Sequence, residues 1–367
     1  MTTVRVQLPT AAAPAYDVAI EPGLIDQLGV LVGTVAPAPS CVLVSDTNVA
    51  PLYLVRAKKS LEAAGYRVIE HIIPAGETHK TVATVAVVWD TVLSAKIERA
   101  TPVIALGGGV VGDLAGFVAA SVLRGVPFIQ VPTTLLAAVD ASVGGKVGID
   151  HAAGKNLIGA FHQPRLVATD IAAFRTLPPR ELRCGLAECI KHGVIRDRAL
   201  FAFIAANASK ILSLDLVTVA ELVAWNVRIK AAVVGEDPFE EGVRALLNFG
   251  HTFGHAIETV TGYGNAVQHG EGVALGMVAA ARTAVRLGRF TAADLAELIA
   301  VIDLVGLPTS LPDLDVDQIF GAMATDKKVR AGKLRLVLPT SIGTAEVCEN
   351  VDPALIRSAL ASLTSRP

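Results

Sequence analysis

The sequence predicts an α/β protein: an N-terminal Rossmann-like domain built on a parallel sheet, followed by a mostly α-helical C-terminal domain. In the first half, short apolar runs alternate with segments of helical period, and the runs lack the polar alternation of half-exposed strands. In the second half, segments of helical period follow one another directly. Between the halves, the prolines of Thr176-Leu177-Pro178-Pro179 prevent a continuous helix. We therefore expect domains over residues 1–176 and 177–367.

Each expected strand of the first half is an apolar run that ends at polar or turn-forming residues. These strands cover residues 41–45, 67–73, 102–106 and 128–131, with helices over 52–64 and 81–94 between them. In the second half we expect helices over 180–195, 199–211, 216–234, 245–261, 272–287 and 292–305, and a hairpin of residues 333–338 and 345–348. Because parallel sheets bind ligands at the carboxyl ends of their strands, the polar residues there predict a binding site.

Composition excludes several classes of function. The net charge is -2 and no basic tract indicates a nucleic acid or a membrane surface as partner. Mean hydropathy is +0.53, but Asp113, Arg124, Asp140 and Lys146 interrupt the longest apolar stretches, so we expect no spanning helix. The N-terminus lacks a secretory pattern, and the four cysteines lack C-x-x-C spacing. We expect a cytoplasmic protein with small, buried thiols.

A group of histidines predicts a metal site. His251 and His255 are four residues apart and would share one face of a helix, and His269 follows nearby. Imidazoles are common ligands of zinc-type cations, and a catalytic site needs a further donor. Glu188, in G-L-A-E-C-I-K-H-G, is the best candidate for that donor. Spacing alone makes His251 and His255 the ligand pair.

The glycine-rich run Gly107–Gly112 matches G-x-G-x-x-G after an expected strand. Such a loop lets backbone amides meet a pyrophosphate, although a tight strand-to-helix turn without a ligand would give the same pattern. The acidic residue expected about 20 positions later is missing, and Asp113 directly after the run is unusual for this motif. Thr133-Thr134 and Asp46-Thr47-Asn48 also follow strands, where they could bind a ligand or cap a helix.

Several cations predict an anionic ligand. Lys146 and Lys155, with Asn156, lie in a glycine-rich apolar segment, where they would either meet anions or extend to solvent. Later in the chain, three pairs have the spacing of neighbours on a helix face: Lys191 with Glu188, Arg244 with Asn248, and Asn248 with His251. They would either place cations beside the metal or form a structural network of ion pairs and hydrogen bonds. Hydrogen-bonded or exposed roles suit the isolated His71, His79, His151 and His162.

Seven motifs in order carry a resemblance to a known family. They are G-G-G-V-V-G-D, P-T-T-L-L-A, K-V-G-I-D-H-A-A-G-K-N, T-L-P-P-R-E, G-L-A-E-C-I-K-H-G, N-F-G-H-T-F-G-H-A-I-E and H-G-E-G-V-A-L-G. Through them nearly the whole chain resembles the 3-dehydroquinate synthase family, whose members are sugar phosphate cyclases and are similar to NAD-dependent glycerol dehydrogenases. The resemblance implies a dehydroquinate synthase-like fold.

The resemblance also implies a reaction: conversion of 3-deoxy-D-arabino-heptulosonate 7-phosphate, a sugar-acid phosphate, into 3-dehydroquinate and phosphate, in the shikimate pathway to aromatic amino acids. It implies NAD that is reduced and reoxidised within one turnover, a divalent metal (Zn or Co) and a homodimer. By motif, the metal ligands are Glu188, His251 and His269. His255 resembles an active-site histidine near the substrate, which replaces its role as a ligand.

Two further sets carry over residue by residue. The resemblance implies NAD contacts at Asp46, Asn48, Gly76, Glu77, Lys80, Gly108, Gly109, Val110, Val111, Gly112, Asp113, Thr133, Thr134, Lys146, Lys155, Ala173, Phe174, Arg175 and Thr176. It implies catalytic or substrate contacts at Asp140, Lys146, Asn156, Lys191, Lys230, Arg244, Asn248 and His255. Arg124 resembles a residue donated by the neighbouring subunit, and a lysine of Asp326-Lys327-Lys328 resembles a further substrate contact.

Two alternative activities remain open at this point. A sister sugar phosphate cyclase would act on a substrate without a carboxylate, and Lys146, Lys230 and Arg244 together favour the heptulosonate acid. An NAD- and metal-dependent polyol dehydrogenase would release stoichiometric NADH and would not need so many cations. A non-enzymatic binding protein would not require an open metal site beside a dinucleotide loop.

Overall fold

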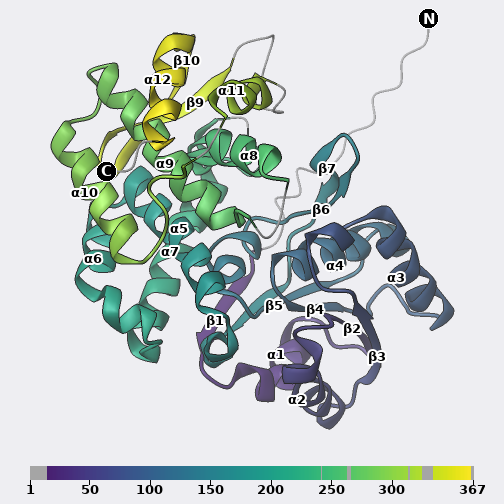
Figure 1. Cartoon of the computed structure of the whole chain (residues 1–367). Helices are drawn as coiled ribbons and strands as arrows, with labels where there is room; N and C mark the ends of the chain where they lie inside the picture. The colour runs from purple at the N-terminus through teal and green to yellow at the C-terminus, as the bar shows by residue number, and fades with distance from the viewer. Residues whose placement is uncertain (1–14, 241, 263–265, 313–314, 325–333, 365–367) are drawn as a thin grey trace, which may run out of the picture.

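The computed structural model describes residues 15–240, 242–262, 266–312, 315–324 and 334–364 (Figure 1). The first half contains a six-stranded parallel sheet in the order β1-β8-β5-β4-β2-β3. Its strands are β1 (Asp17–Glu21), β2 (Ser40–Asp46), β3 (Arg67–Ile73), β4 (Val103–Gly107), β5 (Phe128–Pro132) and β8 (Leu166–Asp170). The expected parallel sheet is confirmed.

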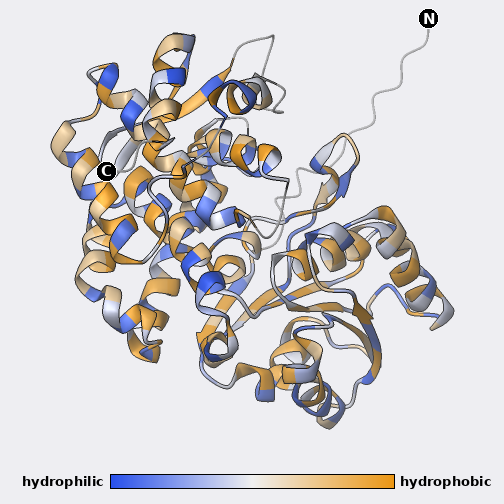
Figure 2. Cartoon of the chain, viewed as in Figure 1, coloured by the Kyte–Doolittle hydropathy of each residue, from blue (hydrophilic) through white to orange (hydrophobic). Residues whose placement is uncertain are grey.

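Helices cover both faces of this sheet, which explains why its central strands are apolar without alternation. In β2, Leu43 packs into a cluster with α1 and α2, whereas Val42 and Val44 pack into a second cluster with α3 and α4. Figure 2 shows the apolar residues on the strands and on the helix faces turned toward them. The helices are α1 (Leu28–Val35), α2 (Ala50–Ala63), α3 (Val82–Ser94) and α4 (Gly109–Ser121).

An antiparallel hairpin of β6 (Lys146–His151) and β7 (Gly154–Phe161) rises from the sheet half beside α8 (Figure 1). This segment is glycine-rich, and the hairpin was not predicted from the sequence. Short helical turns join the larger elements. They are the 3-10 helices η1 (Leu24–Gln27), η2 (Glu77–His79), η3 (Val122–Arg124), η5 (Ile171–Thr176) and η6 (Val243–Asn248), and the π-helix η4 (Ala137–Ala141).

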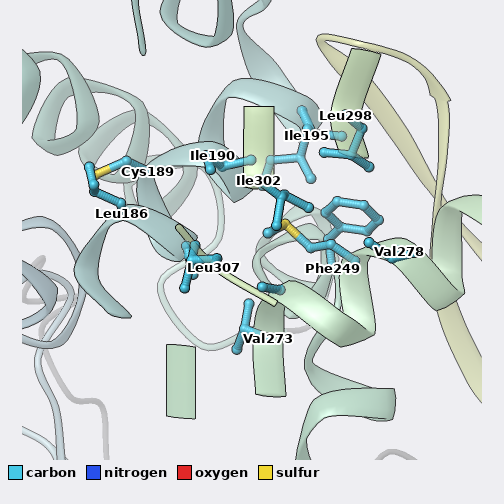
Figure 3. Packing of buried hydrophobic residues seen from close by; sticks show 14 of the residues in the cluster. Leu186, Cys189, Ile190, Ile195, Phe249, Val273, Val278, Leu298, Ile302 and Leu307 are labelled. Carbon is cyan, nitrogen blue, oxygen red and sulfur yellow. The ribbon is translucent and has the colours of Figure 1, made fainter. Parts of the chain in front are cut away.

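The second half is mainly helical, as expected. Its helices are α5 (Pro179–Arg196), α6 (Arg198–Leu212), α7 (Leu216–Glu236), α8 (His251–Val260), α9 (His269–Arg286), α10 (Ala292–Leu304), α11 (Val316–Ala324) and α12 (Pro353–Thr364). The antiparallel strands β9 (Arg335–Ser341) and β10 (Thr344–Glu349) form the predicted hairpin. Figure 3 shows Ile190, Phe249, Val273 and Ile302 in the core of this half.

The same core also includes Leu135 and Phe174 of the first half, so the two halves pack against each other through apolar side chains. The division into domains at residue 176 stays a prediction. Residue 176 is where η5 ends, and α5 begins three residues later with a proline in its first turn. Among the described residues, no helix is long and apolar enough to cross a membrane. All four cysteines are free and buried, as expected.

The continuous helix expected over residues 245–261 is wrong. The 3-10 helix η6 ends at Asn248, and α8 starts at His251 after a turn at Gly250, whose φ is 79°. A Cβ at Gly250 would lie 2.7 Å from the carbonyl oxygen of Val273, so the close approach of α9 also requires glycine here. Asn248 and His251 therefore do not share a face of one helix.

Candidate active site

Three side chains from three helices converge near the start of α9. Glu188 comes from α5, and His251 and His269 are the first residues of α8 and α9. One ligand atom of each lies within 4.8 Å of the others. Glu188 Oε1 lies 3.5 Å from Nε2 of both histidines. The structure thus brings together the three residues that the resemblance implies as metal ligands, and their role as ligands stays a prediction.

Local sequence fixes where α9 begins. Gln268 and Glu271 form a capping box, in which the Glu271 side chain accepts from the Gln268 amide at 2.9 Å. Arg180 holds Glu271 through two hydrogen bonds of 2.7 and 2.6 Å. His269 is consequently the first residue of the helix, held at a defined position opposite Glu188.

The electrostatics of this trio suit a cation. Burial opposes charge on Glu188, but Lys191 and His251 hold the pKa of its carboxyl well below the usual range. Neither Glu188 oxygen accepts a well-oriented hydrogen bond from another described residue, although Lys191 makes an ion pair with one of them. Burial also opposes protonation of His269, but interactions with Glu188 and Glu258 raise its pKa to about 10. An ionised, buried carboxylate beside two imidazoles is a donor set that fits Zn or Co.

A second group of potential ligands shares His269 and contains His255 and Glu258. The His255 ring centroid lies 5.4 Å from that of His251 and 5.9 Å from that of His269. Among the described residues, no group of potential ligands contains both His251 and His255. The pairing that spacing alone suggested is therefore not formed, and His255 lies beside the first trio.

Next to Glu188, two lysines converge on Asp140 in the π-helix η4. Lys191 Nζ lies 3.4 Å from Asp140 Oδ2, and Lys230 from α7 contacts Asp140 Oδ1 and its carbonyl oxygen. Burial favours the neutral acid at Asp140, but Lys191 and Lys230 hold its pKa well below the usual range. Burial lowers the pKa of Lys230. Two buried ammonium groups thus share one carboxylate, although Lys191 also pairs with Glu188, and this concentration of cations suits an anionic ligand.

A second charged group surrounds Glu240, a residue that was not predicted from the sequence. Lys146 makes an ion pair with Glu240, and Asn248 Nδ2 donates to Glu240 Oε1 at 2.7 Å. The guanidinium of Arg244 donates to the carbonyl oxygen of Gly144 at 3.0 Å, so it joins η6 to the start of the hairpin. Lys146 is 48% exposed, and it thus both extends to solvent and meets an anion.

The glycine-rich run forms the expected turn between β4 and α4, where Gly108 caps the helix that contains Gly109, Val110, Val111, Gly112 and Asp113. Asp113 accepts from Lys80 Nζ at 2.6 Å, and the same ammonium group donates to Asn156 Oδ1 of the hairpin. Whether this turn binds a dinucleotide stays a prediction. The structure adds that a buried lysine lies directly beside it.

Other expected contacts lie at the carboxyl ends of neighbouring strands. After β2, Asp46 Oδ1 accepts from the Asn48 amide at 2.8 Å. After β5, Thr134 Oγ1 accepts from the Ala137 amide at 3.1 Å, which confirms its capping role. After β8, Thr176 Oγ1 lies 2.7 Å from the hydroxyl of Tyr53. Of the remaining members of this set, Gly76 and Glu77 follow β3, Thr133 follows β5, and Ala173, Phe174 and Arg175 follow β8.

Two expected substrate contacts stand apart from these clusters. Arg124 ends η3 with a φ of 65°, and among the described residues it forms no ion pair with the site. Its role in a neighbouring subunit stays a prediction. Asp326, Lys327 and Lys328 lie outside the described residues.

Besides Glu240, three buried polar residues were not predicted from the sequence, namely Glu258, His192 and Asn226. Glu258 accepts from His269 Nδ1 at 2.9 Å and from Lys155 Nζ at 3.1 Å. His192 Nδ1 lies 2.9 Å from Asn226 Oδ1 in the core. A signal existed for Glu258, because it lies seven residues after His251 and shares its helix face.

His71 and His162 were expected to be exposed or hydrogen-bonded histidines without a functional role. Their hydrogen bonds to Thr91 and Val126 confirm that they are hydrogen-bonded.

Comparison with known proteins now identifies the family. The family model described as 3-dehydroquinate synthase N-terminal matches residues 70–184, and the corresponding C-terminal model matches residues 185–329. The chain belongs to the 3-dehydroquinate synthase family. A 3-dehydroquinate synthase of Desulforamulus reducens is 47% identical over 361 residues, covering 98% of this chain and 99% of that protein. One of Microcystis aeruginosa is 45% identical and covers 96% of both chains.

Solved structures of sugar phosphate cyclases share the fold, which confirms the expected fold class. The 2-epi-5-epi-valiolone synthase of Streptomyces hygroscopicus, with NAD+ and Zn2+ bound, is 28% identical with a TM-score of 0.90 and covers 99% of this chain and 100% of its own. A 2-deoxy-scyllo-inosose synthase, with carbaglucose-6-phosphate, NAD+ and Co2+, is 25% identical with a TM-score of 0.87 and covers 96% of this chain and 98% of its own. A glycerol dehydrogenase of Schizosaccharomyces pombe, 17% identical with a TM-score of 0.70, shares the fold alone; it covers 95% of this chain and 89% of its own.

Proposed function

We propose that this chain catalyses the reaction of its family, the conversion of 3-deoxy-D-arabino-heptulosonate 7-phosphate into 3-dehydroquinate and phosphate. The observation that carries this proposal is the 47% identity to a 3-dehydroquinate synthase over nearly the full length of both proteins. The side-chain arrangement supports it, because a carboxylate–imidazole trio lies beside the buried lysines Lys191 and Lys230. A substrate with both a carboxylate and a phosphate needs such cations.

We assign the metal to Glu188, His251 and His269. We assign NAD to the residues at the carboxyl ends of β2, β3, β4, β5 and β8, with Lys146 and Lys155 of the hairpin. The buried, ionised Glu188 supports the first assignment, and NAD+ in two cyclases of the same fold supports the second. When bound, NAD supplies a reversible hydride acceptor, and a divalent Zn or Co supplies a Lewis acid toward substrate hydroxyls.

The remaining residues bind and orient the substrate in this proposal. Asp140 holds the ammonium groups of Lys191 and Lys230 together, so both would be directed at one ligand. Lys191, Asn156, His255 and Arg124 would hold the phosphate. The carboxylate and ring would be held by Lys146, Lys230, Arg244 and Asn248. Fixed cations of this kind act by positioning the reacting groups, without needing to reorganise during the reaction.

Phosphate release tests this function most directly. The protein would be given the heptulosonate phosphate with trace NAD, with and without chelator, while NADH absorbance is followed. Chelator-sensitive phosphate release far in excess of NADH is the expected result. His269→Ala should abolish metal binding and turnover while circular dichroism shows an unchanged fold. Stoichiometric NADH from a polyol would instead establish a dehydrogenase.

A sister cyclase activity is the second candidate, favoured by the similarity to the valiolone synthase structure. Sedoheptulose 7-phosphate and glucose 6-phosphate serve as its test substrates, because neither carries a carboxylate. Lys146→Ala should damage turnover of the heptulosonate acid, whose carboxylate it would meet. If the parent protein turns over either of these sugar phosphates faster than the heptulosonate acid, the result would support the sister activity.

We also infer a homodimer that works in the cytoplasm, in which Arg124 of one subunit reaches the site of its partner. Sedimentation would give the oligomeric state. Arg124→Ala and Lys230→Met should each have strongly reduced activity alone, yet mixed dimers of the two should regain activity, because one site would then have both native residues. Absence of recovery in verified mixed dimers would place Arg124 outside the partner's site.

A further inference from the structure

Glu258 is a buried carboxylate that lies beside the proposed metal trio and is not a member of it. It lies on α8, seven residues after His251 and three after His255, so all three side chains share the helix face that is turned toward His269. Its side chain is only 3% exposed. A carboxylate buried to this extent needs partners for both oxygens, because unpaired buried charge is strongly unfavourable.

Each oxygen of Glu258 has a different partner. Oε1 accepts from Nδ1 of His269 at 2.9 Å, and Oε2 accepts from Nζ of Lys155 at 3.1 Å. The ammonium group of Lys155 is a positive charge directly against Oε2, so Glu258 is held as a carboxylate that accepts hydrogen bonds at both oxygens.

This contact decides which nitrogen of His269 is available to a metal. An ionised carboxylate can only accept, so Nδ1 of His269 carries hydrogen. Nε2 is then the nitrogen with the free lone pair in the neutral ring, and it points to Glu188 at 3.5 Å. A carboxylate on the far nitrogen of a metal-binding histidine fixes both its tautomer and its ring orientation.

The second oxygen connects this ligand to a distant part of the chain. Lys155 belongs to β7 of the hairpin, and its Nζ also lies 3.7 Å from Glu77 in η2. A chain of alternating charges thus runs from Glu77 through Lys155 and Glu258 to His269. It joins a segment near the proposed NAD site to the start of α9.

We propose that Glu258 is a positioning residue that orients His269 for the metal and ties this ligand to the β6–β7 hairpin through Lys155. The inference rests on the metal site of the proposed function. The competing assignment makes Glu258 a direct ligand with His255 and His269, the second group of potential ligands. The two assignments differ in what Glu188 does, because Glu188 is a ligand only in the first.

The test measures Co2+ affinity by competition with a chelator for the full-length parent protein and its variants. Glu258→Gln keeps the size of the side chain but removes its charge and one acceptor oxygen. We expect it to bind Co2+ about 10- to 100-fold more weakly. Glu297→Gln is the control, since Glu297 on α10 is a carboxylate that is 42% exposed and paired with Arg198. It should bind Co2+ as the parent does.

A double-mutant cycle tests the connection to the hairpin. Lys155→Met should lower Co2+ affinity by about threefold or more in the parent and should have no further effect in Glu258→Gln, because the two side chains act through one contact. If Glu258→Gln does not fold, Lys155→Met alone still tests the inference, since it leaves Glu258 and His269 in place. Unchanged affinity in that variant would then overturn the inference.

Three other outcomes would also overturn it. Equal Co2+ affinity in Glu258→Gln and the parent would show that His269 does not depend on Glu258. Complete loss of Co2+ binding in Glu258→Gln, with binding kept in Glu188→Gln, would make Glu258 a direct ligand. Failure of the parent protein itself to bind Co2+ would overturn the metal site as well, which distinguishes failure of the proposed function from failure of this inference alone.

Discussion

The ammonium nitrogen of Lys80 lies 2.6 Å from Oδ2 of Asp113, although only 4% of the Lys80 side chain is exposed. Burial opposes its charge, but Asp113 and Glu77 outweigh burial and raise the pKa of Lys80. The lysine thus remains charged inside the protein, directly beside the turn between β4 and α4. Its charge depends on a carboxylate near the start of α4, the helix that follows this turn.

Replacing Asp113 by Asn should lower the free energy of unfolding by about 3 kcal/mol, because it leaves a buried cation without its nearest anion. Urea denaturation measures this. The double variant Lys80→Met/Asp113→Asn should be more stable than Asp113→Asn, since no buried charge is left unpaired. In the exposed pair of Lys58 and Glu70, Glu70→Gln should hardly change stability. Equal urea midpoints for Asp113→Asn and Glu70→Gln would contradict the prediction.

Gly250→Ala should destabilise the protein and weaken metal binding together. The φ of 79° at Gly250 is unfavourable for alanine, and the new Cβ would lie 2.7 Å from the carbonyl oxygen of Val273. The turn fixes the first residue of α8, so His251 would move. We expect a loss of more than about 2 kcal/mol of unfolding free energy, measured with urea, and weaker Co2+ binding.

Gly262, just beyond the other end of α8, is the matched control. Its φ is 83°, but a Cβ there would meet nothing within 4 Å. Gly262→Ala should therefore cost only the backbone strain, about 1 kcal/mol, and should leave Co2+ affinity unchanged. Equal losses in the two variants would show that the contact with α9 contributes nothing at Gly250.

The parallel sheet could be predicted because its signal is local. Val42, Leu43 and Val44 are all apolar since alternate residues of β2 face two different helical layers, and a run without polar alternation indicates that arrangement. The metal trio could be predicted only in part by spacing. Spacing finds residues that share a helix face, but Glu188, His251 and His269 come from three helices. Motif resemblance was needed to select them.

Other features depend on contacts that no short pattern shows. In the β6–β7 hairpin, Gly148 pairs with Gly159, and glycine is not a residue that favours strands. The break at Gly250 results from the approach of α9, whose sequence follows later in the chain. Glu240 joins Lys146 to Asn248 from a turn whose sequence carries no chemical motif. In each case, packing between distant segments decides the local structure.

Acid should destabilise this protein partly through His192. This side chain is buried, and burial followed by the charge of Lys191 lowers its pKa to about 4, while Asp140 and Glu188 act in the opposite direction. The unfolded chain, with a histidine pKa of about 6.5, binds the proton more readily. The neutral ring therefore makes its full contribution to the free energy of unfolding above about pH 6.5. As the pH falls from 6.5 toward 4, this contribution of about 3 kcal/mol is lost.

The free energy of unfolding, measured between pH 4 and 7 for the parent and for His192→Gln, tests this contribution. The variant should have a shallower pH dependence, even if it is less stable at pH 7 through loss of the contact with Asn226. His79 is exposed, so His79→Gln should keep the slope of the parent. An unchanged slope in His192→Gln would show that other groups account for the acid sensitivity.

Substrate recognition should depend on Lys230 far more than its single positive charge suggests. Its side chain is 7% exposed and contacts Asp140, which also pairs with Lys191. In Lys230→Met, Asp140 would compete with the substrate anion for the remaining ammonium group of Lys191. We expect kcat/KM for phosphate release to fall by about 100-fold or more, the value of a lost charged hydrogen bond.

Lys210→Met is the control, because it removes an exposed charge on α6 and should leave kcat/KM unchanged. Because Asp140 causes part of the loss, Lys230→Met/Asp140→Asn should recover some activity, and no recovery would mean that Lys230 acts on the substrate alone.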